Sequence, residues 1–278
     1  MIRYSAIALV LLAAGSAQAA EKTLDRTFTV SPGGGLVVDA DGATVQVSGK
    51  DTNQVTVHII ARGSEKELAT MNLDAAQSGD GVTVTVRRQK ERSWFSWNWN
   101  ADETIEVTVP KNFRIGVRTG GGNIAVADTT GTVKLNTSGG DITVKNVNGS
   151  VDVHTSGGGI LADTIRGDVD ADTSGGDVRL LKVDGKIRAH TSGGNVRCSL
   201  VGVNRGITAS TSGGDIELTL PPGTTGNVQA TTSGGEITTD LPVATTSVKE
   251  GRLAGSLNGG GESIDAHTSG GSIRLRAG

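Results

Sequence analysis

The sequence predicts an all-β fold, a parallel β-solenoid with coils of about 18 residues that each contain two strands. Three observations predict it. The letters Thr-Ser-Gly-Gly recur at a nearly constant interval, and two short runs of alternating apolar and polar residues lie between successive copies. Glycine supplies 42 of 278 residues and hydrophobic residues only 35%, which suits a narrow core filled by successive coils. The seven copies begin at Thr137, Thr155, Thr173, Thr191, Thr211, Thr232 and Thr268.

Residues 137–154 illustrate one coil. Ile142 and Val144 alternate with polar residues, and Val151 and Val153 repeat this pattern nine positions later. The spacing of the two apolar pairs favours a flattened coil with two facing sheets, and strands of successive coils then lie ~4.8 Å apart. A three-sided coil built from six-residue rungs has the same length and is the alternative.

The repeated glycines are predicted to be structural. We expect each pair to reverse the chain through φ > 0, and the Thr and Ser hydroxyls to cap turn amides and bond the neighbouring coil. Gly149, Gly167 and Gly185 mark a second, shorter turn in each coil. The paired turn glycines are Gly139, Gly140, Gly157, Gly158, Gly175, Gly176, Gly193, Gly194, Gly213, Gly214, Gly234, Gly235, Gly270 and Gly271.

The pattern divides the chain into three parts. Residues 1–19 have a charged start, a short apolar run and the sequence Ala17-Gln18-Ala19, which predicts a signal peptide and an exported, periplasmic or extracellular protein. Residues 20–118 form an irregular β region, and residues 119–278 form the repeat solenoid, continuous with it. No second apolar segment is long enough to span a bilayer.

Two irregular segments interrupt the pattern. Ser64 and Glu67 form a capping box, and Leu68, Met71 and Ala75 share one helical face, so a helix is expected over residues 64–77 against an end or edge of the solenoid. The last interval between repeats is 36 residues. We expect it to contain one degraded coil.

Composition and motifs exclude several function classes. The net charge of −3 argues against a nucleic-acid partner, and the glycines lie between strands, not before a helix as in nucleotide-binding loops. No histidine pair has metal-ligand spacing, and we expect neither metal nor cofactor. Residues after the Gly pairs, such as Asp141 and Asp177, are two coils apart, too far for a calcium ladder. The single cysteine, Cys198, is in the inward register and is expected in the core.

The segment 87–100, "RRQKERSWFSWNWN", is not explained by the repeat. We expect a hairpin there. Aromatic rings beside cations suit contact with a glycan or membrane surface, because each indole couples an apolar plane to one N–H donor. The alternative is a hydrophobic lid on the solenoid. The candidate contact residues are Arg87, Arg88, Lys90, Arg92, Trp94, Phe95, Trp97 and Trp99.

One outward face could support a different function. His154, Asp172 and His190 occupy equivalent positions on consecutive coils, and Asp152, Asp170 and Arg188 precede them by two residues. Paired carboxylates of this kind could act on an extracellular polysaccharide. A flat, solvated face has no cleft, so the enzyme is the alternative hypothesis and a non-enzymatic binding or scaffold module is the preferred one.

The opening "FTVSPGGGLVVDADGATVQVSG", the strand "VTVP" and the run of "TSGGDI" units carry a resemblance. The chain resembles a bacterial adhesin family of unknown function, related to the head domains of autotransporter adhesins, over essentially the whole mature chain. The resemblance implies an exported β-solenoid with an adhesion or envelope role, and it supplies no catalytic residues. The implied partner is an envelope polymer, a glycan, a membrane surface or a protein.

Overall fold

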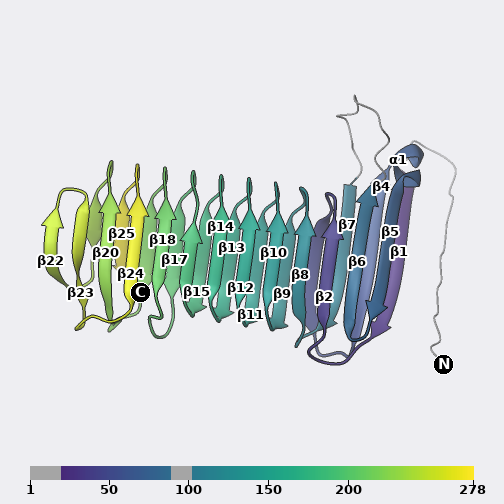
Figure 1. Ribbon diagram of the computed structural model, residues 1–278, viewed down its shortest axis with the longest axis horizontal. Helices are drawn as coiled ribbons and strands as arrows, with labels where there is room; N and C mark the ends of the chain where they lie inside the picture. Colours follow the sequence, from purple (N-terminus) through teal and green to yellow (C-terminus); the bar gives the residue numbers. More distant parts are fainter. Residues whose placement is uncertain (1–19, 89–101) are drawn as a thin grey trace.

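Two long β-sheets face each other along the whole molecule (Figure 1). The structure is a computed structural model that describes residues 20–88 and 102–278. Sheet A has 12 strands and sheet B has 13, and each regular coil gives one strand to each sheet. The predicted all-β solenoid is therefore confirmed, with two sheets.

The central coils stack in parallel and in register. Val133, Val151 and Val169 lie opposite one another in sheet B, as do Ile124, Ile142 and Ile160 in sheet A. The central strands of sheet B are β8 (Arg114–Thr119), β10 (Val133–Thr137), β12 (Val151–Thr155), β14 (Val169–Thr173), β16 (Ile187–His190) and β18 (Ile207–Thr211). Those of sheet A are β9 (Ile124–Thr130), β11 (Ile142–Asn148), β13 (Ile160–Arg166), β15 (Val178–Asp184), β17 (Val196–Leu200) and β19 (Ile216–Leu220).

The edge where sheet B strands turn into sheet A strands carries the Thr-Ser-Gly-Gly turns, and we call it the Gly-pair edge. Each threonine is buried and donates its hydroxyl to a carbonyl of the neighbouring coil. Thr155 Oγ1 donates to the Gly140 carbonyl at 2.9 Å and accepts the Gly158 N–H at 3.4 Å. The expected hydroxyl contacts with the turn and with the next coil are thus confirmed for threonine.

The predicted backbone geometry of these glycines is wrong. All of them lie in the described part of the chain, and none has a φ in the left-handed region. The second glycine of each pair is required by contact between coils, because a Cβ at Gly158 would lie 2.1 Å from the Gly140 carbonyl oxygen. The first glycine is less crowded. A Cβ at Gly157 would lie 3.6 Å from the Gly139 oxygen.

Positive φ occurs at the opposite edge, which we call the short-turn edge. Gly149 and Gly167 have φ of 153° and 150°, as expected for the shorter turn, whereas the φ of Gly185 lies outside the left-handed region. In four consecutive coils, one further residue has left-handed geometry just before this edge. It kinks the sheet A strand so that residues three apart, such as Val144 and Val147, both face the core. These residues are Asp128, Asn146, Thr164 and Lys182, with φ between 52° and 62°.

The N-terminal end departs from sequence order. The coil of β2 (Gly35–Ala40) and β3 (Thr44–Lys50) lies between the β8/β9 coil and the coil of β6 (Gly81–Arg88) and β7 (Asp102–Pro110). Antiparallel strands complete this end: β4 (Gln54–Gly63) on β7, β1 (Ala20–Thr29) on β4, and β5 (Met71–Ser78) on β6. Both sheets are therefore extended beyond the last parallel strand.

The helix expected over residues 64–77 is shorter. The capping box of Ser64 and Glu67 is present, but α1 (Glu65–Ala69) ends after five residues. From Met71 onward the chain forms β5, since the outer edge of β6 offers hydrogen-bond partners along all of its length. Leu68 is buried, and α1 packs against β1 and β4 at the N-terminal end of the solenoid.

The 36-residue interval contains no degraded coil. After the coil of β20 (Gly226–Thr232) and β21 (Ile237–Thr239), a hairpin of β22 (Val243–Lys249) and β23 (Arg252–Leu257) adds antiparallel to β20. The final strands, β24 (Ser263–Thr268) and β25 (Ile273–Ala277), then insert between β18/β19 and β20/β21 (Figure 1). The hairpin extends sheet B, and β21 is the last strand of sheet A.

Candidate binding surface

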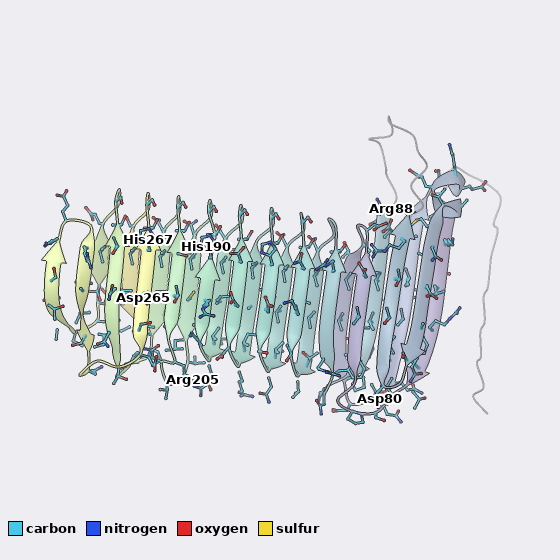
Figure 2. The ribbon with its side chains drawn as sticks, in the orientation of Figure 1. Asp80, Arg88, His190, Arg205, Asp265 and His267 are labelled. Carbon is cyan, nitrogen blue, oxygen red and sulfur yellow. The ribbon has the colours of Figure 1, made fainter. Side chains whose placement is uncertain are left out.

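The segment singled out in the sequence begins at the outer parallel coil. Arg88 ends β6 in sheet B and Asp102 begins β7 in sheet A, so their connection occupies the place that the Gly-pair turns have in the central coils. Figure 2 shows Arg88 on the Gly-pair edge near α1. The other candidate contact residues lie outside the described residues, so the choice between contact surface and lid stays a hypothesis; they are Lys90, Arg92, Trp94, Phe95, Trp97 and Trp99.

Arg87 is held by two carboxylates of the neighbouring coil. It forms ion pairs with Asp39 and, at 2.8 Å, with Asp41. The backbone N–H of Arg88 donates to the second Asp41 oxygen at 2.8 Å. Burial acts to raise the pKa of Asp41, but the hydrogen bonds from Arg88 and Arg87 outweigh it and the pKa lies below its usual value.

Arg88 is held by a buried carboxylate at the start of β7. Its guanidinium lies 2.6 Å from Glu103 Oε1, and Glu103 is 3% exposed. Burial raises the pKa of Glu103 and outweighs the opposing effect of Arg88. In the described chain, the other oxygen, Oε2, has no hydrogen-bond partner.

These contacts connect β2, β6 and β7 and fix the two points where residues 89–101 leave the sheets. Arg87 and Arg88 are engaged within the chain, and their predicted contact with a partner stays a hypothesis. The sequence did not point to Asp39, Asp41 or Glu103, because β2 and β6 are separated by 40 residues of chain. Only the pairing of these strands brings the charges together.

The candidate enzymatic residues form two rows on the outer face of sheet B, as expected. His154 lies opposite Asp172, and Asp172 opposite His190; His267 continues this row on β24 (Figure 2). His154 Nδ1 lies 2.9 Å from Asp172 Oδ1, and Arg188 lies 3.9 Å from Asp170.

Asp152 accepts from Lys134 at 2.8 Å, and the side chains of Asp152 and Asp170 are more than half exposed. A hydrolytic pair needs one carboxyl whose surroundings keep it protonated. These carboxylates are instead solvated and matched with cations, which favours a surface role.

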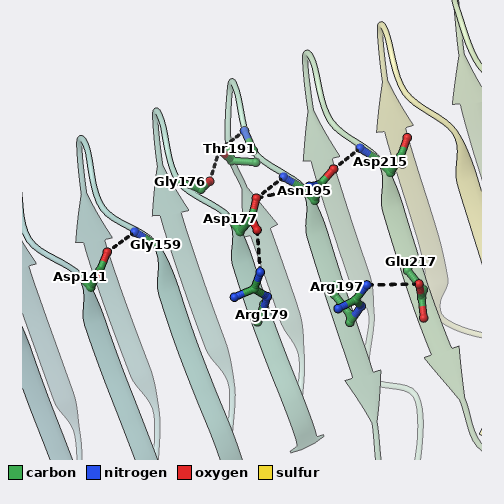
Figure 3. A network of polar contacts seen from close by, with 11 residues as sticks. Asp141, Gly159, Gly176, Asp177, Arg179, Thr191, Asn195, Arg197, Asp215 and Glu217 are labelled. Carbon is green, nitrogen blue, oxygen red and sulfur yellow. Dashed lines mark hydrogen bonds and ion pairs between the residues drawn. The ribbon is translucent and has the colours of Figure 1, made fainter.

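Residues after the Gly pairs form a ladder of side-chain to backbone bonds (Figure 3). Asp141 Oδ1 accepts the Gly159 N–H at 2.7 Å, and Asp177 Oδ1 accepts the Asn195 N–H at 2.9 Å. These bonds give the residues after the Gly pairs a structural role, since each links the turns of two neighbouring coils. Among the residues that the structure describes, no group of three or more His, Cys, Asp or Glu side chains could hold a metal ion.

Cys198 lies in the core, as expected from its register. It is 1% exposed, and burial raises the pKa of its thiol to about 12. A thiol in this environment stays protonated and unreactive.

Three comparisons place the chain among known proteins. No curated protein matches it. A crystal structure named a "putative adhesin" from Bacteroides fragilis is 13% identical, with a TM-score of 0.48, over 94% of this chain and 100% of that one. A "putative lipid binding protein" from Parabacteroides distasonis is 13% identical, with a TM-score of 0.44, over 92% of this chain and 96% of that one.

Within residues 20–88 and 102–278, no helix is long and apolar enough to cross a membrane. The family model described as Toastrack DUF4097 matches residues 35–276, from β2 to β25. The match spans both irregular ends as well as the central coils, and it confirms the family expected from the sequence. The chain belongs to the Toastrack DUF4097 family.

Proposed function

We propose that the protein is an exported, non-enzymatic binding module of the bacterial cell envelope that presents residues 89–101 from the N-terminal end of a rigid solenoid. The observation that carries the proposal is the charge network at the base of this segment. Asp39 and Asp41 hold Arg87, and Glu103 holds Arg88, so both ends of the segment start from fixed points.

A fixed base lowers the conformational entropy lost when a surface segment binds a partner. The segment itself supplies Trp94, Trp97 and Trp99 with Lys90 and Arg92. Indole planes suit sugar faces and the interfacial zone of a bilayer, and cations attract the phosphate and carboxylate groups of envelope polymers and lipids. The signal sequence predicted over residues 1–19 would deliver the chain to such partners.

The test compares a triple and a double variant in co-sedimentation with isolated envelopes. Replacing Trp94, Trp97 and Trp99 by Ser should strongly reduce the bound fraction while the melting temperature stays nearly unchanged. The matched control removes apolar surface elsewhere by changing Val201 and Val203, which are 40% and 68% exposed, to Ser. This control should bind like the unmodified chain.

Two results would contradict the proposal. A large fall in melting temperature for the tryptophan variant would identify the segment as a lid on the solenoid. Unchanged binding by that variant would show that another surface makes the contact.

A further inference from the structure

We propose that a polar depression on sheet B, beside the base of this segment, binds an acidic sugar unit through Arg118 and Asn136. The inference rests on the proposed function and deepens it, because it assigns a ligand class and a second contact site. All residues of the site lie in the described part of the chain. The site lies at the Gly-pair edge, where sheet B meets the turns.

Four different polar side chains form one outward row across the depression. Asp39, Arg118, Asn136 and His154 lie directly opposite one another on β2, β8, β10 and β12. Neighbouring members are one strand spacing apart, ~4.8 Å. A ligand the size of a sugar ring therefore spans two or three of them.

Among the described residues, the two central members have no side-chain partner. Arg118 lies opposite Asp39 in the strand pairing, but Asp39 and the nearby Asp41 are both engaged by Arg87. In the described chain neither the Arg118 guanidinium nor the Asn136 amide makes a side-chain hydrogen bond or ion pair. The Arg118 guanidinium lies between Asp39, which is bonded to Arg87, and Asn136, whose side-chain amide makes no bond in the described chain. It can therefore donate two hydrogen bonds to a single ligand group.

His154 completes the row with a fixed orientation. Its Nδ1 bonds Asp172, which leaves Nε2 available to a ligand. The depression has a volume of about 500 Å³, and Ser138 and Ser156 line its rim. That volume lies within the range typical of small-ligand sites, roughly 300–1,000 Å³.

The charges indicate the ligand class. Asp39 and Asp41 balance the charges of Arg87 and Arg118 in number, but both carboxylates are bonded to Arg87, so among the described residues Arg118 is the cation without an ion pair. A carboxylate matches a guanidinium in a planar, two-bond geometry. Amide, imidazole and serine groups match the hydroxyls of a sugar, since each can donate or accept. A sugar bearing one carboxylate satisfies both sets.

The experiment titrates the full mature chain by calorimetry with trigalacturonate and sialyllactose, and with their neutral counterparts galactotriose and lactose. Binding of at least one acidic probe and of neither neutral probe is expected. Arg118→Gln and Asn136→Ala should each weaken that binding by about tenfold or more, equivalent to ~1.4 kcal/mol. Arg197→Gln is the matched control, because Arg197 is 55% exposed on sheet A and pairs loosely with Glu217 at 3.6 Å (Figure 3); it should bind like the unmodified chain.

Several results would overturn the site. The chain could fail to bind either acidic probe, or it could bind the neutral probes equally well. Equimolar inorganic phosphate could displace the acidic probe, or Arg118→Gln and Arg197→Gln could lose the same amount of affinity. A chain that sediments with envelopes through the tryptophan segment but ignores the acidic sugars would refute this site alone. A chain that binds the acidic sugars but not envelopes would refute the proposed function and leave the site intact.

Discussion

The two edges of the solenoid turn the chain by different means. At the Gly-pair edge, glycine is required because the backbones of successive coils touch, and the threonine hydroxyls bond across that contact. At the short-turn edge, one residue in each of four consecutive coils has positive φ, as at Asn146 and Thr164. The need for glycine at the Gly-pair edge comes from contact between coils, whereas the need for positive φ at the short-turn edge comes from the path of the chain within one coil.

The difference explains the uneven repetition of the sequence. A contact between coils restricts both partners, so each copy of Thr-Ser-Gly-Gly must fit the copy before and after it. Left-handed geometry within a strand restricts only its own residue. The chain accordingly repeats Thr-Ser-Gly-Gly seven times, whereas the kinked position varies among Asp128, Asn146, Thr164 and Lys182.

The largest effect is expected at the second glycine of a pair. Gly140→Ala places a Cβ 2.2 Å from the Gly122 carbonyl oxygen, so two coils must separate locally. We expect a loss of about 3 kcal/mol in the free energy of unfolding, measured by chemical denaturation. Gly139→Ala is the control, since its Cβ would lie 3.7 Å from the Gly121 oxygen, an ordinary contact. Similar losses for both variants would contradict the contact mechanism.

A smaller loss is expected from the threonine ladder. Thr155→Val keeps the side-chain shape but removes the bonds to the Gly140 carbonyl and the Gly158 N–H, both at a buried turn. The expected loss is about 2 kcal/mol, the cost typical of buried groups left unsatisfied. At the short-turn edge Ser150 is exposed and lies 3.4 Å from the Thr132 hydroxyl, so Ser150→Ala should change stability by less than about 0.5 kcal/mol. Equal effects would remove the distinction between the edges.

The central coils were predictable from sequence because their partners are copies of themselves. Once the period is known, Val151 must lie opposite Val169, and the apolar alternation identifies the inward rows. The prediction of positive φ at the Gly pairs failed for a related reason. Some glycines are required because the backbone of the next coil leaves no room for a Cβ, and others because the backbone has a positive φ. The sequence does not distinguish the two cases, and only the stacking of the coils does.

The ends were not predictable because their neighbours are distant in the chain. Residues 71–78 have a helical pattern, but β6 presents an edge that only the folded N-terminal end creates. The insertion of β24 between β18 and β20 likewise follows from which edges are available, which no local pattern records. The same limit hid Glu103 and the row from Asp39 to His154, since both combine residues from separate coils.

A modest gain is expected at the short-turn edge. Thr164 is β-branched and has φ of 62°, a conformation that Asn tolerates better than Thr. Thr164→Asn should therefore raise the free energy of unfolding by about 1 kcal/mol, despite loss of the hydrogen bond to Asp163. Thr143→Asn, in the regular part of the neighbouring strand, should lower it slightly. A loss at both positions would show that left-handed strain does not matter at this edge.

The smallest effect concerns the N-terminal end of the Gly-pair edge, where Arg88 pairs with the buried Glu103. Burial raises the folded-state pKa of Glu103, so its stabilising contribution is complete below the unfolded pKa and is lost as pH rises through the raised value. Glu103→Gln keeps an acceptor for Arg88 and does not ionise. The difference in melting temperature between this variant and the unmodified chain should therefore increase from about pH 4 to about pH 7.5. The corresponding gain in the free energy of unfolding should stay below about 1 kcal/mol. Arg87→Gln, which loses its partners Asp39 and Asp41, should show the opposite trend, because the pKa of Asp41 is lowered and its contribution appears as pH rises. The relative melting temperature of Glu103→Gln could instead fall with rising pH. That result would mean that attraction to Arg88 outweighs the effect of burial on the Glu103 carboxylate, and that the ionised forms of both Glu103 and Asp41 stabilise this edge.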